Sequence, residues 1–144
     1  MLKRLLLSLG AVAAAALAAS GELTIRSDSY AVEAYIAKDG TVRDASYRIK
    51  GYIEPDTGTV RDDSYRTVGY IDDKTIRDAS YRTIGYLDGA TLRDDSYRTI
   101  GYLDAGGVRD ASYRTVAYFE GEMFPKLATR FVAAYVFFFS RLLL

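Results

Sequence analysis

The chain has 144 residues, including 13 tyrosines and 6 phenylalanines, and its 19 basic residues balance 19 acidic ones. A zero net charge gives no support to nucleic-acid binding, and the absence of cysteine excludes both disulfides and the lipid-modified cysteine of bacterial lipoproteins. The folded protein must therefore be stabilised by packing alone, and the many aromatic residues favour strands over disorder.

Residues 1–20 have the pattern of a secretory signal peptide. Lys3 and Arg4 precede a long apolar run that ends in small residues. The run is shorter than the ~20 residues of a membrane-spanning helix, so an uncleaved anchor is the less favoured alternative. We expect cleavage between Ala18 and Gly21 and export to the periplasm or the medium. Loss of the two basic residues would leave 17 basic against 19 acidic residues, a net charge of −2.

Residues 21–122 repeat one short motif. A typical copy is Thr75–Ala90, TIRDASYRTIGYLDGA, and a divergent first copy occupies Leu23–Gly40. Two tyrosines in each copy stand five positions apart. The leading arginines of the copies are Arg26, Arg43, Arg61, Arg77, Arg93 and Arg109, separated by 17, 18, 16, 16 and 16 residues. A short fixed period predicts one small supersecondary unit per copy, stacked or closed upon its neighbours.

Each copy predicts a β-hairpin. Tyr81–Leu87 is rich in aromatic and β-branched residues and predicts a strand, and Thr91–Arg93 predicts its shorter partner. The loop between them, here Asp88–Ala90, varies in length among copies, whereas the connection Asp78–Ser80 does not. We expect the variable loops on an outer rim and the fixed Asp-x-Ser turns where space is tight.

Alternation along the strand predicts that Tyr81, Thr83, Gly85 and Leu87 share one face. Since neither face is wholly polar, we expect each hairpin to pack on the next. A glycine in the middle of a strand weakens that strand, so we expect a tyrosine ring or another backbone segment to occupy the space beside it. Open ends would expose sheet edges, so we expect the strand near Leu23–Arg26 to close a ring by pairing with Tyr113–Phe119.

The reiterated RD-x-SYRT-[IV]-GY-[IL] pattern, the N-terminal export pattern and the Phe-rich tail resemble the five-fold β-flower proteins, small secreted bacterial proteins. The resemblance implies hairpin petals around an axis and implies no activity. It leaves open whether five or six petals close the ring. It also implies Ser-Gly at the fixed turn, where this sequence has Ser-Tyr. The predicted fold is an all-β closed ring of short β-hairpin repeats with a C-terminal α-helix.

Residues 123–144 predict that apolar helix, with Pro125 in its first turn. The favoured interpretation is a plug that fills the repeat core. The alternative is an interfacial anchor whose Lys126, Arg130 and Arg141 lie at lipid head groups. Burial of Phe131, Tyr135 and Phe138 against the repeats would decide for the plug.

The chain contains no histidine and no cysteine, so we expect no catalytic residues, no metal site and no cofactor. Carboxylates such as Asp94 and Asp95 could in principle serve a glycoside hydrolase. They recur beside arginines in every full copy, which favours arginine–aspartate pairs with turn-capping hydrogen bonds. The Asp-x-Ser spacing lacks the acid ladder of calcium loops.

The sequence therefore predicts an exported, non-enzymatic structural or binding scaffold. Two alternatives remain, a carbohydrate-binding or envelope-binding module and a membrane-interface protein. A glycan, an envelope component or a protein are the candidate partners. The candidate ligand-binding residues are Tyr65, Arg66, Tyr81, Arg82, Tyr97, Arg98, Tyr113 and Arg114. The alternative interpretation is that the tyrosines form the hydrophobic core.

Overall fold

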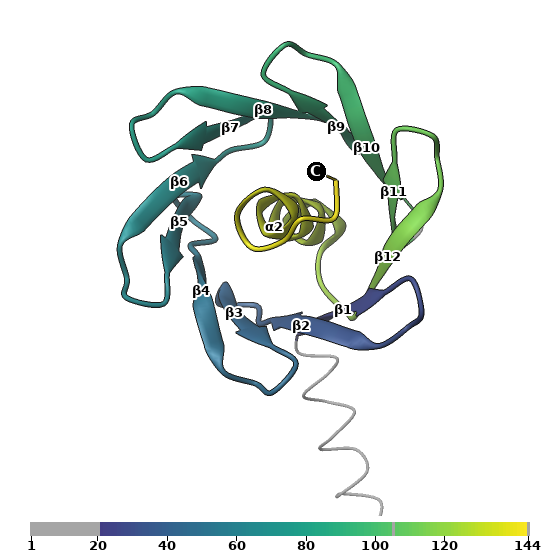
Figure 1. The fold of residues 1–144 in the computed structure, drawn as a ribbon. Helices are drawn as coiled ribbons and strands as arrows, with labels where there is room; N and C mark the ends of the chain where they lie inside the picture. The colour runs from purple at the N-terminus through teal and green to yellow at the C-terminus, as the bar shows by residue number, and fades with distance from the viewer. Residues whose placement is uncertain (1–20, 105, 144) are drawn as a thin grey trace, which may run out of the picture.

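The structure, a computed structural model, describes residues 21–104 and 106–143. The predicted signal peptide lies outside the described residues. Within them, antiparallel strands form one closed sheet around helix α2, Pro125–Phe138 (Figure 1), as predicted. The strands are β1 Leu23–Ser27, β2 Val32–Ile36, β3 Thr41–Asp44, β4 Ile49–Ile53, β5 Thr59–Asp62, β6 Thr67–Ile71, β7 Thr75–Asp78, β8 Thr83–Asp88, β9 Thr91–Asp94, β10 Thr99–Asp104, β11 Gly107–Asp110 and β12 Thr115–Glu120.

Consecutive strands form hairpins that we call petals. The described residues contain six of them: petal 1 is β1–β2, petal 2 is β3–β4, and so on to petal 6, β11–β12. Petal 1 is built from the divergent first copy, and the other five carry the full RD-x-SYR motif. The ring closes where β1 pairs with β12, with Ile25 opposite Phe119, which confirms the predicted closure. Closure leaves no unpaired edge in this sheet.

The two kinds of connection lie opposite to the prediction. The fixed Asp-x-Ser turns form the outward tips of the petals (Figure 1). The variable loops lie nearer the axis, where Arg130 of α2 donates to the carbonyl of Pro55 at 3.0 Å and to Asp73 at 2.6 Å. The fixed turns keep their length because their own hydrogen bonds require it. The loops differ because a single helix presents a different neighbour to each of them.

The predicted alternation is wrong at the start of each long strand. In petal 4, Ile76 pairs with Gly85 and Arg77 pairs with Thr83, so Ile84 is an extra residue in a β-bulge. Thr83 therefore shares the outer face with Arg77 and not the inner face with Gly85. Tyr81 belongs to the turn, because β8 begins at Thr83. Each hairpin contacts the next by edge-to-edge strand pairing within one sheet.

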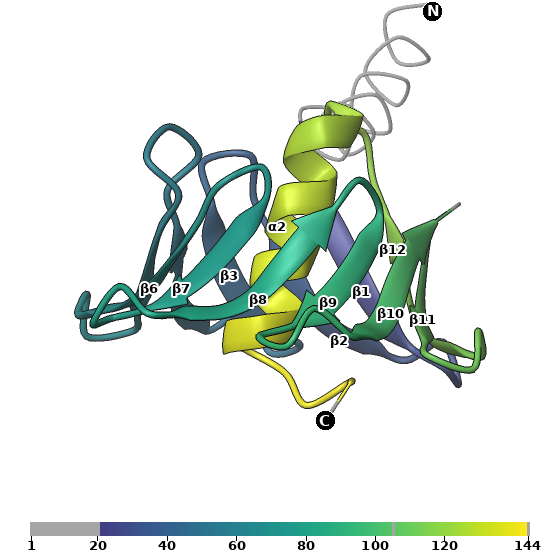
Figure 2. The same cartoon turned by 90° about the horizontal axis from the view of Figure 1, so that it is seen from above.

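Aliphatic residues on the inner face of the sheet pack against α2, which runs along the ring axis (Figure 2). Ile76, Leu92 and Phe131 are fully buried, and Tyr135 is 7% exposed. Phe138 is half-buried against the same core. The predicted plug is therefore confirmed, and the apolar face required by the anchor alternative is occupied. In the described part of the chain, no helix combines the length and the apolar character that crossing a membrane requires.

The mid-strand glycines receive the end of the helix and the segment after it. A Cβ on Gly85 would lie 2.5 Å from the Phe137 ring, and one on Gly101 would lie 2.6 Å from Leu143. Each of these glycines also faces the carbonyl oxygen of an arginine on the next strand, so the expected close backbone approach is confirmed. The expected tyrosine ring is replaced by a residue of the C-terminal segment. The pairs are Gly51 with Phe139, Gly69 with Phe138, Gly85 with Phe137 and Gly101 with Leu143.

Candidate binding surface on the petals

Each fixed turn is held by its aspartate. In petal 4, the amide of Tyr81 donates to the carbonyl of Asp78 at 2.9 Å, and the Asp78 carboxylate accepts the amides of Ser80 and Arg82, both at 2.9 Å. These amide hydrogen bonds, with the one from Arg82 foremost, hold the pKa of Asp78 below its usual range. The predicted turn-capping role of the aspartates is thereby confirmed.

The turn places its tyrosine in the left-handed backbone region. Tyr81 has φ +68°, and the five equivalent tyrosines have φ between +66° and +70°. A three-residue hairpin loop favours glycine at this position, because a side chain there costs roughly 1–2 kcal/mol. The turn tyrosines are Tyr30, Tyr47, Tyr65, Tyr81, Tyr97 and Tyr113, and they are between 51% and 61% exposed.

Each turn tyrosine packs against an arginine and a second tyrosine. The guanidinium of Arg77 lies 4.6 Å from the centroid of the Tyr81 ring, and the Tyr70 ring meets Tyr81 edge to face at 5.2 Å. Arg77 also donates to the Thr83 hydroxyl at 3.0 Å. We call this unit a Tyr–Arg–Tyr cluster. The clusters of petals 1 to 6 are Tyr118–Arg26–Tyr30, Tyr35–Arg43–Tyr47, Tyr52–Arg61–Tyr65, Tyr70–Arg77–Tyr81, Tyr86–Arg93–Tyr97 and Tyr102–Arg109–Tyr113.

A carboxylate joins most of these clusters. In petal 1, Glu120 accepts from Arg26 at 2.6 Å and from the Tyr30 hydroxyl at 3.0 Å. The same contacts lower the pKa of Glu120 and raise the pKa of Tyr30. The carboxylates that bind turn-tyrosine hydroxyls are Glu120 in petal 1, Glu22 in petal 2, Glu54 in petal 3, Asp88 in petal 5 and Asp104 in petal 6.

Petal 4 differs from the others. The equivalent acid, Asp72, accepts the amides of Lys74 at 2.8 Å and Thr75 at 2.7 Å within its own loop. Among the described residues, no carboxylate bonds to the Tyr81 hydroxyl or to the Arg77 guanidinium. Tyr81 is also the most exposed of the turn tyrosines, at 61%.

The sequence-predicted candidates divide into two groups. The tyrosines Tyr65, Tyr81, Tyr97 and Tyr113 lie in the clusters, half-exposed at the petal tips. The arginines that follow them lie outside the clusters and pair with the capping aspartates: Arg66 with Asp62, Arg82 with Asp78, Arg98 with Asp94 and Arg114 with Asp110, at 3.0 to 3.2 Å. About 80% of each of these arginine side chains is exposed, so the ion pairs contribute little to stability.

Sequence reasoning missed the leading arginines and the second tyrosines as surface residues. Arg77 faces Tyr70 across β6 and β7, and it faces Thr83 across the bulge. The signal was present in the repeat, because the leading arginine and the second tyrosine both occupy outer positions of short strands. Recognising it required the register between neighbouring hairpins.

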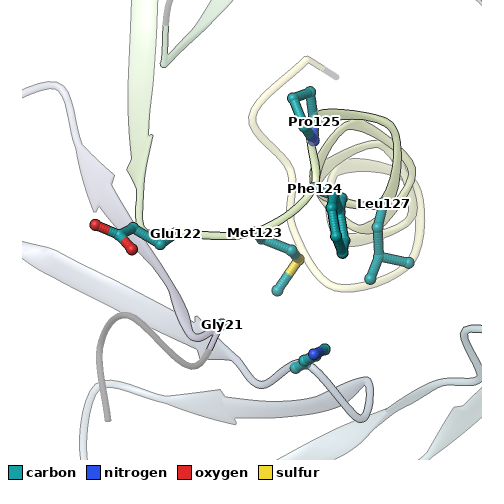
Figure 3. A pocket seen from close by; sticks show the side chains of 7 residues that line it. Gly21, Glu122, Met123, Phe124, Pro125 and Leu127 are labelled. Atoms are coloured by element: carbon teal, nitrogen blue, oxygen red, sulfur yellow. The ribbon is translucent and has the colours of Figure 1, made fainter. Parts of the chain in front are cut away.

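A hollow lies where α2 begins. It measures about 340 Å³ and is lined by Met123, Phe124, Leu127 and Lys38, with Gly21 at its edge (Figure 3). Phe124 is 76% exposed there. The hollow is open and mostly apolar, and it holds no group of acids. Among the described residues, no three acidic side chains are grouped closely enough to hold a metal ion.

Comparison with known proteins adds one finding. A family model described as "5-fold beta-flower protein" matches residues 22–140. No curated protein and no solved structure is similar enough to count as a match. The matched range covers every strand and helix α2.

Proposed function

The chain belongs to the 5-fold β-flower proteins, and from that premise we propose that it is an exported, non-enzymatic scaffold whose petals bind saccharide chains. Family membership accounts for the ring of repeats. The Tyr–Arg–Tyr clusters supply the chemistry for a ligand, and the pattern of residues 1–20 supports export.

The observation that carries the proposal is a tyrosine at the left-handed position of every fixed turn. Its backbone costs roughly 1–2 kcal/mol relative to glycine. The arginine and tyrosine contacts, roughly 0.5–1 and 0.5–1.5 kcal/mol respectively, offset that cost without a clear surplus. Stability alone therefore gives little reason for a half-exposed ring at these sites. Strained residues at equivalent surface positions indicate a functional role.

The geometry of a cluster suits a sugar. The C–H face of a pyranose is apolar and packs on an exposed aromatic ring, while its hydroxyls accept from guanidinium groups. One face of Tyr81 is covered by Arg77, and the exposed remainder points outward at the petal tip. Six such clusters around one ring favour a polymer that repeats the same unit, because the second contact is intramolecular once the first has formed.

The experiment is isothermal titration of the chain from Glu22 onward with chitotetraose and with soluble peptidoglycan fragments. The test variant replaces Tyr65, Tyr81, Tyr97 and Tyr113 by glycine, which suits the backbone at each turn. We expect saccharide binding in the wild type and at least ~10-fold weaker binding in the variant, at an unchanged circular dichroism spectrum.

A control variant replaces the following arginines Arg66, Arg82, Arg98 and Arg114 by glutamine. These residues lie outside the clusters, so we expect this variant to bind like the wild type. Equal binding by the tyrosine variant, or no saccharide binding by the wild type, would remove the binding function and leave a purely structural scaffold. Export is tested separately, by whether residues 1–20 are removed and the protein is recovered outside the cytoplasm of a bacterial host.

A further inference from the structure

The cluster of petal 4 has a cation without a neighbouring anion. Arg77 donates through Nη1 to Thr83, and its Nε is buried without a hydrogen-bond partner in the described part of the chain. The Nε of Arg93 in petal 5 is also unpaired, but Nη2 of Arg93 still reaches Asp88 at 3.3 Å. Petal 4 is therefore the cluster in which both the arginine and the turn tyrosine are left without a carboxylate.

The loop before β7 explains the difference. In petal 4 it reads Asp72-Asp73-Lys74, and the Asp72 carboxylate turns back to accept two loop amides. In petal 5 it reads Asp88-Gly89-Ala90, with Gly89 at φ +62°. That turn leaves the Asp88 carboxylate to reach Arg93 and Tyr97 at 3.3 Å each. The sequence of the loop therefore determines whether the carboxylate accepts hydrogen bonds from the loop amides or from the arginine and tyrosine of the cluster.

The outer position of Arg77 favours an anion from outside the chain. A buried guanidinium N–H that lacks a partner is costly, and a carboxylate is its best-matched acceptor. Tyr81 beside it offers a hydroxyl donor and an exposed ring. In five petals a carboxylate of the chain itself occupies the corresponding position on the tyrosine hydroxyl.

We propose that petal 4 binds the carboxylate of an acidic sugar, which takes the place that Glu120 occupies in petal 1, where it accepts from the Nε of Arg26 and from the Tyr30 hydroxyl. Arg77 and the Tyr81 hydroxyl donate to the carboxylate, and the sugar ring packs on Tyr81. This inference rests on the proposed saccharide-binding function. It adds that the preferred ligand is negatively charged and that its preferred site is petal 4. The remaining clusters, which already contain an acid, bind neutral sugar units.

The experiment compares trigalacturonic acid with its methyl ester, which has the same rings without the charge. We expect the wild-type chain from Glu22 onward to bind the acid about tenfold more tightly than the ester, with one tight site per chain in isothermal titration. Arg77→Gln should remove this preference. The matched control Arg93→Gln, in a cluster that already has Asp88, should retain it.

Two exchanges between the petals sharpen the test. The double variant Asp73→Gly, Lys74→Ala gives petal 4 the loop of petal 5, so the Asp72 carboxylate is released to Arg77 and the tight site is lost. Asp88→Asn frees Arg93 in petal 5, so the number of tight sites rises from one to two. Melting curves of each variant confirm that the ring is folded.

The outcomes separate the two proposals. If acid and ester bind alike, or if Arg77→Gln keeps the preference, the acidic site of petal 4 is wrong while saccharide binding stands. If neither the trisaccharides nor the chitotetraose and peptidoglycan fragments used above bind, both proposals fail together. Retention of the tight site in the double loop variant would also overturn the assignment to petal 4.

Discussion

The axis of the ring and its outer wall are made by the same strands, yet they are organised differently. On the outer wall, every petal has the same neighbours, so the arginine, the two tyrosines and their distances recur around the ring. At the axis, one helix cannot match the repetition of the sheet, and each petal meets a different residue of α2 or of the segment after it. Repetition therefore builds a surface of equivalent sites, while a single non-repeated segment stabilises the ring.

The comparison predicts that removing a buried side chain at the axis destabilises the whole ring, whereas removing an exposed side chain alters only the surface. Phe131→Ala removes a fully buried ring from the centre and should lower the free energy of unfolding by about 3–5 kcal/mol. Phe124→Ala, which removes a ring that is 76% exposed, should change it by less than about 0.5 kcal/mol. Urea unfolding of the two variants provides the measurement. Equal losses of unfolding free energy would contradict the distinction between the buried axis and the exposed surface.

The axis should also be more sensitive to alkaline pH. Burial raises the pKa of Tyr135 to about 12, whereas the unfolded phenol ionises near pH 10. The stabilising preference for the neutral phenol is complete below pH 10 and is lost as the pH rises to about 12, which corresponds to about 2–3 kcal/mol. Urea unfolding at several pH values should show this loss in the wild type and a smaller loss in Tyr135→Phe. Parallel curves for the two proteins would show that Tyr135 does not contribute.

A glycine substitution tests the contact between the axis and the wall. Gly69→Ala places a methyl group against the Phe138 ring and the carbonyl of Arg77, so it should cost about 1–3 kcal/mol. Gly89→Ala meets nothing within 4 Å and only strains a turn at φ +62°, which should cost about 1 kcal/mol. Thermal melts of both variants provide the test. A larger loss of stability at Gly89 would mean that backbone strain, and not steric crowding, determines the cost of replacing these glycines.

A small effect is also expected at a petal tip. Tyr81→Gly loses the ring contacts but relieves the left-handed backbone, so stability should change by less than about 1 kcal/mol. Tyr81→Ala loses the same contacts and keeps the strain, so it should be less stable than the glycine variant by about 1 kcal/mol. If Ala and Gly were equally stable, the strain argument for a functional tyrosine would fail.

Features set by local chemistry could be predicted from the sequence. The period and the need to bury sheet edges predicted the closed ring and the pairing of β1 with β12, and the aspartates predicted the capped turns. The helix plug followed from an apolar segment beside an unfilled core. Each of these depends on residues that lie close in sequence or on a requirement of the whole fold.

Features set by register could not be predicted. The bulge at Ile84 turns Thr83 outward, and only then does Arg77 lie between Thr83 and Tyr70. The repeat places two arginines near each tyrosine, and the sequence favours the adjacent one, which the structure pairs with the capping aspartate. The orientation of the Asp72 carboxylate depends on the backbone of a three-residue loop, which composition does not determine.

The position of the plug in the chain has a consequence for how the protein is made. Phe131 and the rings that pack on the mid-strand glycines follow all of the repeats in the chain, and the outer edge of β1 is paired only once β12 has been made. The petals made first therefore have neither a filled centre nor a closed sheet until β12 and α2 have been made. The export proposed above would benefit from this order, because the native fold forms only after the segment that contains α2 has followed the repeats.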